Sequence, residues 1–271
     1  MAHKPRIVVV GNGMAGVAVV EAILKTKKQT AITIFGDESY TNYNRILLSD
    51  VLAGKTSFEK IVLNTQEWYT DNGIDLRLGV SVNAIDPVSK SVIDANGQAT
   101  PYDSLVLAMG GLPYLPPILG SNKKGIMVFR TMDETKEIVR LARGSTEAVV
   151  IGGGLLGLEA ARGLMNYGVS VSVVHLLDRL MEQQLDDVGA SLLKREIERM
   201  GIRIVLNATA KEIVGDEEVS GVVLTTGETI PCNMALICAG IRPNLTLTKT
   251  AGIFVNRGVL VNDQMQTNVP D

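Results

Sequence analysis

The segment RIVVVGNGMAG at residues 6–16 constrains the fold more than any other part of the chain. The β-branched apolar residues at 7–10 predict a short buried strand, and the apolar run at 17–24 predicts a helix. Between them lies a G-x-G-x-x-G turn made of Gly11, Asn12, Gly13, Met14, Ala15 and Gly16. In this pattern the first glycine permits a tight turn, the second lets backbone N–H groups approach a pyrophosphate, and the third lets the helix pack closely. The order strand, glycine turn and helix therefore predicts a dinucleotide site at the positive end of a helix dipole.

The same construction occurs a second time in the chain. Residues 147–151 form an apolar run, followed by a turn that contains Gly152, Gly154, Leu155, Leu156 and Gly157, and then by an apolar, helix-like run at 158–165. Two such units predict two dinucleotides, most economically a flavin and a nicotinamide. The alternative is a pair of glycine-rich turns in a general α/β protein.

The residue that ends the second strand of each unit bears on ribose recognition. After the first turn, the strand at 31–35 leads to Asp37 and Glu38, and either carboxylate could accept hydrogen bonds from a ribose, about 20 residues beyond the turn. An exposed acidic turn is the alternative. After the second turn, the strand at 169–174 ends in His175. An acid there would favour NAD and an arginine NADP, whereas histidine can donate to a hydroxyl or a phosphate, so this preference stays open.

Composition excludes several classes of function. The 271 residues are 46% hydrophobic and 20% charged with a net charge of −3, which describes a globular protein and argues against nucleic-acid binding. No run reaches the roughly 18 apolar residues of a membrane span, and no signal peptide precedes the first strand, so we expect a cytoplasmic protein with no membrane partner. The two cysteines, Cys232 and Cys238, are too few for an iron–sulfur cluster, and the two histidines too few for an all-histidine metal site.

Proline and glycine mark the domain boundary. Pro113, Pro116 and Pro117 stand beside glycines in the clearest linker of the chain. We therefore expect one domain from residues 1–112 plus 241–271, and a second domain from residues 113–240 inserted in it. Further helices are expected at 57–72, 133–142 and 186–200, and strand character is expected again after residue 251. Arg45, the one cation of the loop-to-helix segment at 40–54, could meet a phosphate or a flavin carbonyl, or could be a surface arginine.

Five motifs in order carry a family resemblance: GNGMAG, NYNRILLSDVLAG, LAMGGLPYLPP, IGGGLLGLEAA and AGIRPN. Together they resemble the FAD-dependent pyridine-nucleotide oxidoreductases, which include ferredoxin and rubredoxin reductases. The stretch HLLDRLMEQQLDDVGASLLKREIERMGI is more similar still to the FAD/NAD(P)H portion of assimilatory nitrite reductase large subunits. The resemblance covers essentially the whole chain. It implies an α/β fold of two Rossmann-like dinucleotide-binding domains of the three-layer FAD/NAD(P) type, the second inserted in the first.

The resemblance also implies a function. NAD(P)H would pass hydride to FAD, and electrons would continue to an iron–sulfur and sirohaem module or to a small redox protein. By matching motif position, FAD binding is expected at Gly11, Asn12, Gly13, Met14, Ala15, Gly16, Asp37, Glu38, Arg45, the backbone of Val82, Gly110 and Arg130. NAD(P)H binding is expected at Gly152, Gly154, Leu155, Leu156, Gly157, His175 and Gly240. Glu159 matches a carboxylate near the flavin–nicotinamide junction; a helix-capping acid is the alternative.

Three departures from the family pattern qualify this expectation. Met109 stands where many relatives have threonine, and Asp50 stands where many ferredoxin reductases have lysine. The sequence also stops at TNVPD, where relatives continue into a flavin-binding segment and a C-terminal domain, so we expect a piece of a larger flavoprotein. The alternatives are a ferredoxin- or rubredoxin-reductase-like protein and a nucleotide-binding fragment without turnover. The oligomeric state, a homodimer included, stays open.

Overall fold

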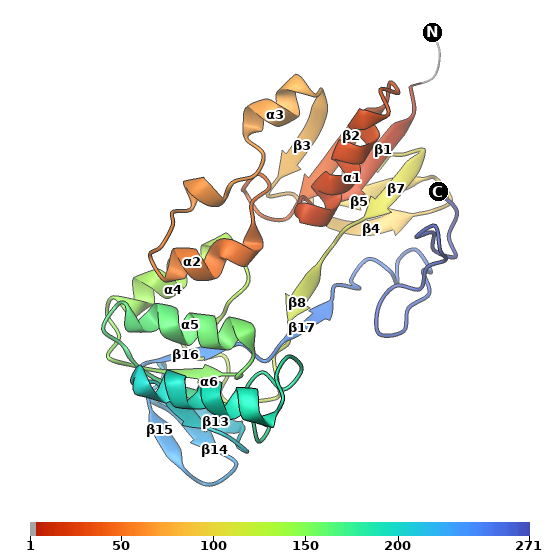
Figure 1. Ribbon diagram of the computed structural model, residues 1–271. Coiled ribbons are helices and arrows are strands. Elements are labelled where there is room, and N and C mark those ends of the chain that lie inside the picture. The colour runs from red at the N-terminus through yellow and green to blue at the C-terminus, as the bar shows by residue number, and fades with distance from the viewer. Residues whose placement is uncertain (1–3) are drawn as a thin grey trace. The chain divides into compact units, whose positions relative to one another are not determined.

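The computed structural model describes residues 4–271 and divides into two compact units. Among the described residues, the first unit comprises 4–44, 62–112 and 243–271, and the second comprises 45–61 and 113–242 (Figure 1). Each unit is built on its own parallel sheet. The predicted fold class, α/β with two Rossmann-like units, is confirmed.

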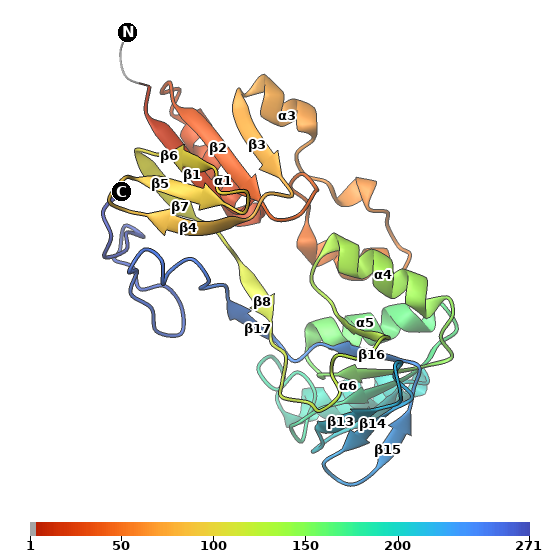
Figure 2. The ribbon, with the colours of Figure 1, turned by 180° about the vertical axis from the view of Figure 1, so that it is seen from behind.

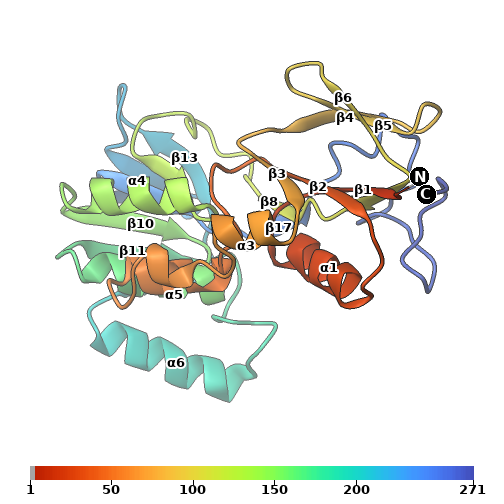
Figure 3. The ribbon, with the colours of Figure 1, turned by 90° about the horizontal axis from the view of Figure 1, so that it is seen from above.

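The first unit has three layers. Its central parallel sheet has the strand order β3-β2-β1-β7, and β4, β5 and β6 form a separate antiparallel sheet. Helix α1 covers one face of the parallel sheet, and the antiparallel sheet covers the other (Figures 2 and 3). Alternate side chains of β1 supply the two cores: Val9 packs with Val17 and Val20 of the helix, whereas Val8 packs with Val92 of the antiparallel sheet.

The elements of the first unit are β1 (Arg6–Val10), α1 (Met14–Lys25), β2 (Ala31–Gly36), α3 (Gln66–Asp71), β3 (Ile74–Leu78), β4 (Val82–Asp86), β5 (Ser91–Asp94), β6 (Ala99–Pro101) and β7 (Ser104–Leu107). The chain passes between the units through β8 (Gly111–Pro113) and β17 (Ile241–Pro243), which pair with each other.

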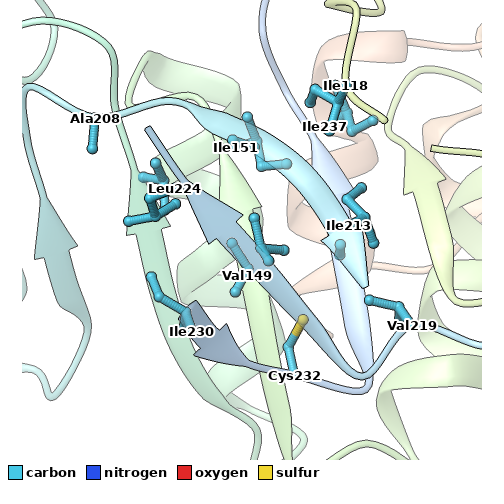
Figure 4. Packing of buried hydrophobic residues seen from close by; sticks show 14 residues of the cluster. Ile118, Val149, Ile151, Ala208, Ile213, Val219, Leu224, Ile230, Cys232 and Ile237 are labelled. Carbon is cyan, nitrogen blue, oxygen red and sulfur yellow. The ribbon is translucent and has the colours of Figure 1, made fainter. Parts of the chain in front are cut away.

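The second unit repeats this plan. Its parallel sheet has the order β12-β11-β10-β16-β9, and β13, β14 and β15 form an antiparallel sheet. Helices α5 and α6 lie on one side of the parallel sheet, and the antiparallel strands lie on the other (Figure 3). Val149 and Ile151 of β10 point toward Ile213 and Leu224 in the core between the two sheets (Figure 4). Burying a valine or leucine in this way stabilises the fold by about 1.5–3 kcal/mol per side chain.

The elements of the second unit are the short helices η1 (Arg45–Leu47), α2 (Leu48–Leu52) and η2 (Glu59–Ile61), then β9 (Ile126–Val128), α4 (Met132–Ala142), β10 (Glu147–Ile151), α5 (Leu155–Met165), β11 (Ser170–Val174), α6 (Asp187–Arg199), β12 (Arg203–Val205), β13 (Ala210–Val214), β14 (Gly221–Leu224), β15 (Thr229–Pro231) and β16 (Met234–Ile237).

Two helices of the second unit begin where their capping residues predict. Thr131 and Glu134 form a reciprocal capping box at α4, since each side chain accepts a backbone N–H of the other's residue. Asp186 caps α6 by accepting the N–H of Gly189 at 2.8 Å. The expected helices at 133–142 and 186–200 are therefore confirmed.

Two expected elements are wrong, and one segment is grouped differently. The expected helix at 57–72 is only η2 and α3, because Thr65 is extended and Val62 forms a β-bridge with Tyr43. The expected strands after residue 251 are turns with one bridge, Val255 to Val259. Residues 45–61, which fall within the expected first domain, pack with the second unit.

Candidate functional site

The first glycine turn is held by contacts that admit no side chain. Gly11 has a φ of +115°, and its N–H donates to the carbonyl of Phe35 at 2.8 Å. A Cβ on Gly11 would lie 2.1 Å from the oxygen of Ala108, and a Cβ on Gly16 would lie 2.0 Å from the oxygen of Gly11. Glycine is therefore required at both positions, because strand, turn and helix meet through backbone atoms.

The front of this turn is open. Gly13 is the N-cap of α1, its φ of −85° suits any residue, and a Cβ built there meets nothing within 4 Å. No side chain caps the helix, and its first turn carries no acidic residue. Met14 is 41% exposed at the same end. The backbone N–H groups and the positive end of the dipole thus face open space, the arrangement that binds phosphate groups.

The second turn has the same backbone conformation, hydrogen bond and close backbone contacts as the first. Gly152 has a φ of +125°, its N–H donates to the carbonyl of Val174 at 2.8 Å, and its Cβ would lie 2.3 Å from the oxygen of Cys238. A Cβ on Gly157 would lie 2.0 Å from the oxygen of Gly152. Gly154 caps α5 with open space before it and no acid in the first helical turn. The second turn therefore offers the same anion-binding surface.

The predicted residues around the two turns occupy matching places. Gly110 and Gly240 follow β7 and β16, the strands that lead to Ala108 and Cys238, and both have left-handed φ values, +64° and +101°. Leu155 and Leu156, the first residues of α5, are 60% and 38% exposed. Each turn thus lies beside a second backbone bend and an exposed apolar helix start.

The two carboxylates after β2 differ in their surroundings. Asp37 is exposed immediately after the strand. The Glu38 carboxylate accepts a hydrogen bond from the hydroxyl of Tyr43 at 2.8 Å, which commits one of its oxygens. Val82, also predicted along the cofactor, is the buried first residue of β4. Of the two alternatives, Asp37 is thus the carboxylate that the strand end exposes.

Asn12, between the glycines of the first turn, has a partner that sequence reasoning missed. The hydroxyl of Tyr69 donates to Asn12 Oδ1 at 2.9 Å, and Asn12 Nδ2 donates to the carbonyl of Tyr40 at 3.4 Å. Burial raises the pKa of Tyr69, so the phenol remains a donor at neutral pH. Tyr69 is thus both a buried core residue and a hydrogen-bond donor that holds the turn.

His175 lies at the end of β11 as predicted, but its ring is turned into the protein. Its Nδ1 accepts the N–H of Gly153 at 3.0 Å, and its Nε2 is buried 3.2 Å from Glu182 Oε2 without the geometry of a hydrogen bond. A direct contact of this ring with a ribose therefore requires the ring to leave these positions. No residue pattern indicates this contact, because the partner of the ring is the backbone N–H of Gly153.

Arg45 and Arg130, both predicted along FAD, are joined within the second unit. Arg45 Nη1 donates to the carbonyl of Arg130 at 2.5 Å, and the N–H of Arg130 donates to Glu134 Oε2 at 2.8 Å. The first of these bonds joins the start of η1 to the segment that precedes α4. Their contact with a flavin stays a prediction.

Glu159 lines a cavity of about 340 Å³ in the second unit. The cavity lies among α2, α5 and α6, and Asp50, Lys55 and Arg162 also line it. Glu159 is the fifth residue of α5 and no acidic residue lies in the first turn, so the helix-capping alternative is wrong. Lys55 Nζ lies 3.2 Å from Asp50 Oδ1. A cation thus lies beside Asp50 in this cavity.

Two further properties concern cysteines and metals. Both cysteines are free, and burial raises the pKa of Cys232 to about 11 and that of Cys238 to about 12, so both thiols are protonated at neutral pH. Within residues 4–271, no group of three or more His, Cys, Asp or Glu side chains could hold a metal ion. Over the same residues, no helix is long and apolar enough to span a membrane.

Two parallel sheets, each with a glycine turn before an uncapped helix, define a protein with two dinucleotide-binding folds. The sequence identifies the family: the chain belongs to the pyridine nucleotide-disulphide oxidoreductases, whose family model matches residues 5–271.

Named relatives and one solved structure agree with this membership. The chain is 47% identical to the NAD(P)H nitrite reductase of Bacillus subtilis (strain 168) over 98% of its own length and 33% of that protein. It is 32% identical to the rubredoxin–NAD(+) reductase of Pseudomonas putida, over 97% of this chain and 69% of that protein. The crystal structure of the covalent putidaredoxin reductase–putidaredoxin complex matches with a TM-score of 0.93 and 28% identity, over 98% of this chain and 66% of that chain. The chain thus spans about a third of the nitrite reductase that it matches.

Proposed function

We propose that this chain is the NAD(P)H-oxidising flavoprotein part of an electron-transfer enzyme, with FAD on the first unit and NAD(P)H on the second. The observation that carries the proposal is the repetition of one turn geometry. In both turns a Cβ on the last glycine would lie 2.0 Å from the oxygen of the first, while the middle glycine faces open space. Two equivalent pyrophosphate sites are what a hydride relay between two dinucleotides requires.

The residues present fit both groups. Neither helix that follows a turn has a side-chain cap or an acid in its first turn, so no carboxylate of the helix's own first turn competes with a pyrophosphate. Asp37 supplies an exposed carboxylate at the end of β2, suited to the hydroxyl groups of a ribose. When bound, the nicotinamide and the flavin supply the hydride and electron chemistry, and the protein supplies binding and orientation.

Glu159 is the candidate for a role at the reaction centre. It lines the cavity among α2, α5 and α6 with a side chain that is half-buried. The ion pair of Asp50 and Lys55 lines the same cavity. We propose that Glu159 acts as a fixed carboxylate near the junction of flavin and nicotinamide, where it orients polar groups of the cofactors.

The onward acceptor is proposed from the relatives. The 47% identity to a nitrite reductase favours delivery to the iron–sulfur and sirohaem part of such an enzyme. The rubredoxin reductase, at 32% identity, and the putidaredoxin reductase complex support the second candidate, delivery to a small redox protein. The difference in identity over nearly the whole chain ranks the first candidate above the second.

A visible absorption spectrum of the purified protein, after addition of FAD, tests the proposal. We expect a flavin band that bleaches on anaerobic addition of NADH or NADPH. Two matched variants separate the sites: Gly13→Val and Gly154→Val both place a side chain in open space without a backbone clash. Gly13→Val should lose FAD, whereas Gly154→Val should keep FAD but no longer bleach. Retention of both properties by both variants would contradict the assignment of the turns.

A further inference from the structure

His175 is joined directly to the second glycine turn. It is 8% exposed, and its Nδ1 accepts the N–H of Gly153, the residue between Gly152 and Gly154, at 3.0 Å. The ring and the turn also pack against each other, since a Cβ on Gly153 would lie 2.8 Å from His175 Cγ. The absence of a side chain at Gly153 is thus what allows the ring to reach the turn.

The backbone on both sides of this contact is fixed. The N–H of His175 donates to the carbonyl of Val205 at 2.8 Å, and its carbonyl accepts the N–H of Ala208 at 3.1 Å. On the turn, the carbonyl of Gly153 accepts the N–H of Met181 at 3.2 Å. The ring therefore links the end of β11 to the peptide N–H of Gly153, which precedes Gly154, the N-cap of α5.

The contact with Gly153 requires a ring that carries no proton on Nδ1. Because an acceptor nitrogen carries no proton, a neutral ring with Nδ1 bonded to Gly153 carries its proton on Nε2. The charged group that faces Nε2 is Glu182, whose Oε2 lies 3.2 Å away and favours a proton there. Arg179, nearby in the same loop, is paired with Asp187 at 2.9 Å.

We propose that His175 is a positioning residue of the nicotinamide site: its unprotonated Nδ1 holds the N–H of Gly153 so that Gly154 and the start of α5 face the pyrophosphate. This rests on the proposed function of the second turn. A second proton on the ring would place two N–H donors 3.0 Å apart at Gly153, so the turn or the ring must move. Dinucleotide affinity should therefore depend on a hydrogen-bond acceptor at the position of Nδ1.

Two substitutions at His175 separate the hydrogen bond from packing. In His175→Asn the amide oxygen takes the place of Nδ1 as an acceptor, whereas His175→Leu keeps apolar bulk and removes the acceptor. With NADH as the probe, His175→Leu should raise the Kd about tenfold, the scale of one lost hydrogen bond, and His175→Asn should stay within about threefold of the unchanged protein.

Hydrogen exchange at the Gly153 amide tests the contact without any ligand. The amide should be protected in the unchanged protein and in His175→Asn, and should exchange at least tenfold faster in His175→Leu. Equal exchange in all three proteins, or equal loss of NADH affinity in both variants, overturns the proposal. If the exchange differs as expected but neither NADH nor NADPH binds the unchanged protein, the contact stands, but the nicotinamide site fails and the positioning role fails with it.

Discussion

Replacing Gly157 by alanine tests whether the second turn depends on direct contact between helix and turn. The alanine Cβ would lie 2.0 Å from the oxygen of Gly152, a backbone atom, and real Cβ atoms essentially never approach closer than 3.0 Å. Helix α5 and the turn must therefore separate by at least about 1 Å. Overpacking of this severity costs about 3 kcal/mol, and alanine recovers up to about 1 kcal/mol of helix propensity, so we expect a net loss of about 2 kcal/mol.

Gly154→Ala is the matched control for this substitution. Gly154 is three residues away in the same motif, its φ is −82°, and its Cβ would meet nothing within 4 Å. The small loss of an N-cap glycine and the gain from a stiffer unfolded chain are of similar size, so the free energy of unfolding should change by less than about 0.5 kcal/mol.

Urea unfolding followed by far-UV circular dichroism measures both variants, with the transitions of the two units fitted separately. Only the transition of the second unit should move in Gly157→Ala. If Gly157→Ala and Gly154→Ala unfold at the same urea concentration, the close approach of Gly157 to Gly152 does not restrict this position and the reasoning is refuted.

Three further predictions use the same unfolding measurement. Thr131→Ala removes the capping box that Thr131 shares with Glu134, and should cost about 1 kcal/mol; an unchanged midpoint would show that the box is not stabilising. Because burial raises the pKa of Cys232 from 9.0 to about 11, its contribution to stability is full below about pH 9 and should fall by about 1.4 kcal/mol by pH 10, a decline that Cys232→Ala should lessen. Gly153→Asn and His175→Gly should each destabilise the second unit. The double variant should recover at least about 1 kcal/mol of their summed loss, because it reproduces the pair Asn12 and Gly36 of the first unit.

The two turns could be predicted from sequence because glycine alone meets their requirements. Gly11 and Gly152 need left-handed φ values, and Gly16 and Gly157 need a backbone contact at which a Cβ would be 2.0 Å from an oxygen. Requirements of this kind admit one residue type, so the sequence records them directly. The flanking strands were equally clear, because the last four residues of each are apolar and the last three are buried on both faces.

The errors fall where tertiary contacts override a local pattern. Residues 57–72 have helical spacing, but the bridge between Val62 and Tyr43 interrupts the segment before Thr65 begins α3. After residue 251 the sequence is β-like, yet Ile253 is buried in the core of the first unit without joining a sheet. In the second of these places burial, rather than backbone pairing, explains the apolar residues.

In each unit one side chain fills the space between the second residue of the glycine turn and the end of the neighbouring strand, but the two units supply it from different segments. In the first unit the side chain belongs to the turn: Asn12 stands there, and the residue after the neighbouring strand is Gly36, whose Cβ would lie 3.0 Å from that of Asn12. In the second unit the turn has Gly153, and the strand end supplies His175. The pattern G-x-G-x-x-G does not show this exchange, because it allows any residue at the second position, where Asn12 and Gly153 stand. The exchange makes the turns chemically unequal, because a carboxamide fills this space in the first unit and an imidazole, whose Nδ1 accepts the N–H of Gly153, fills it in the second.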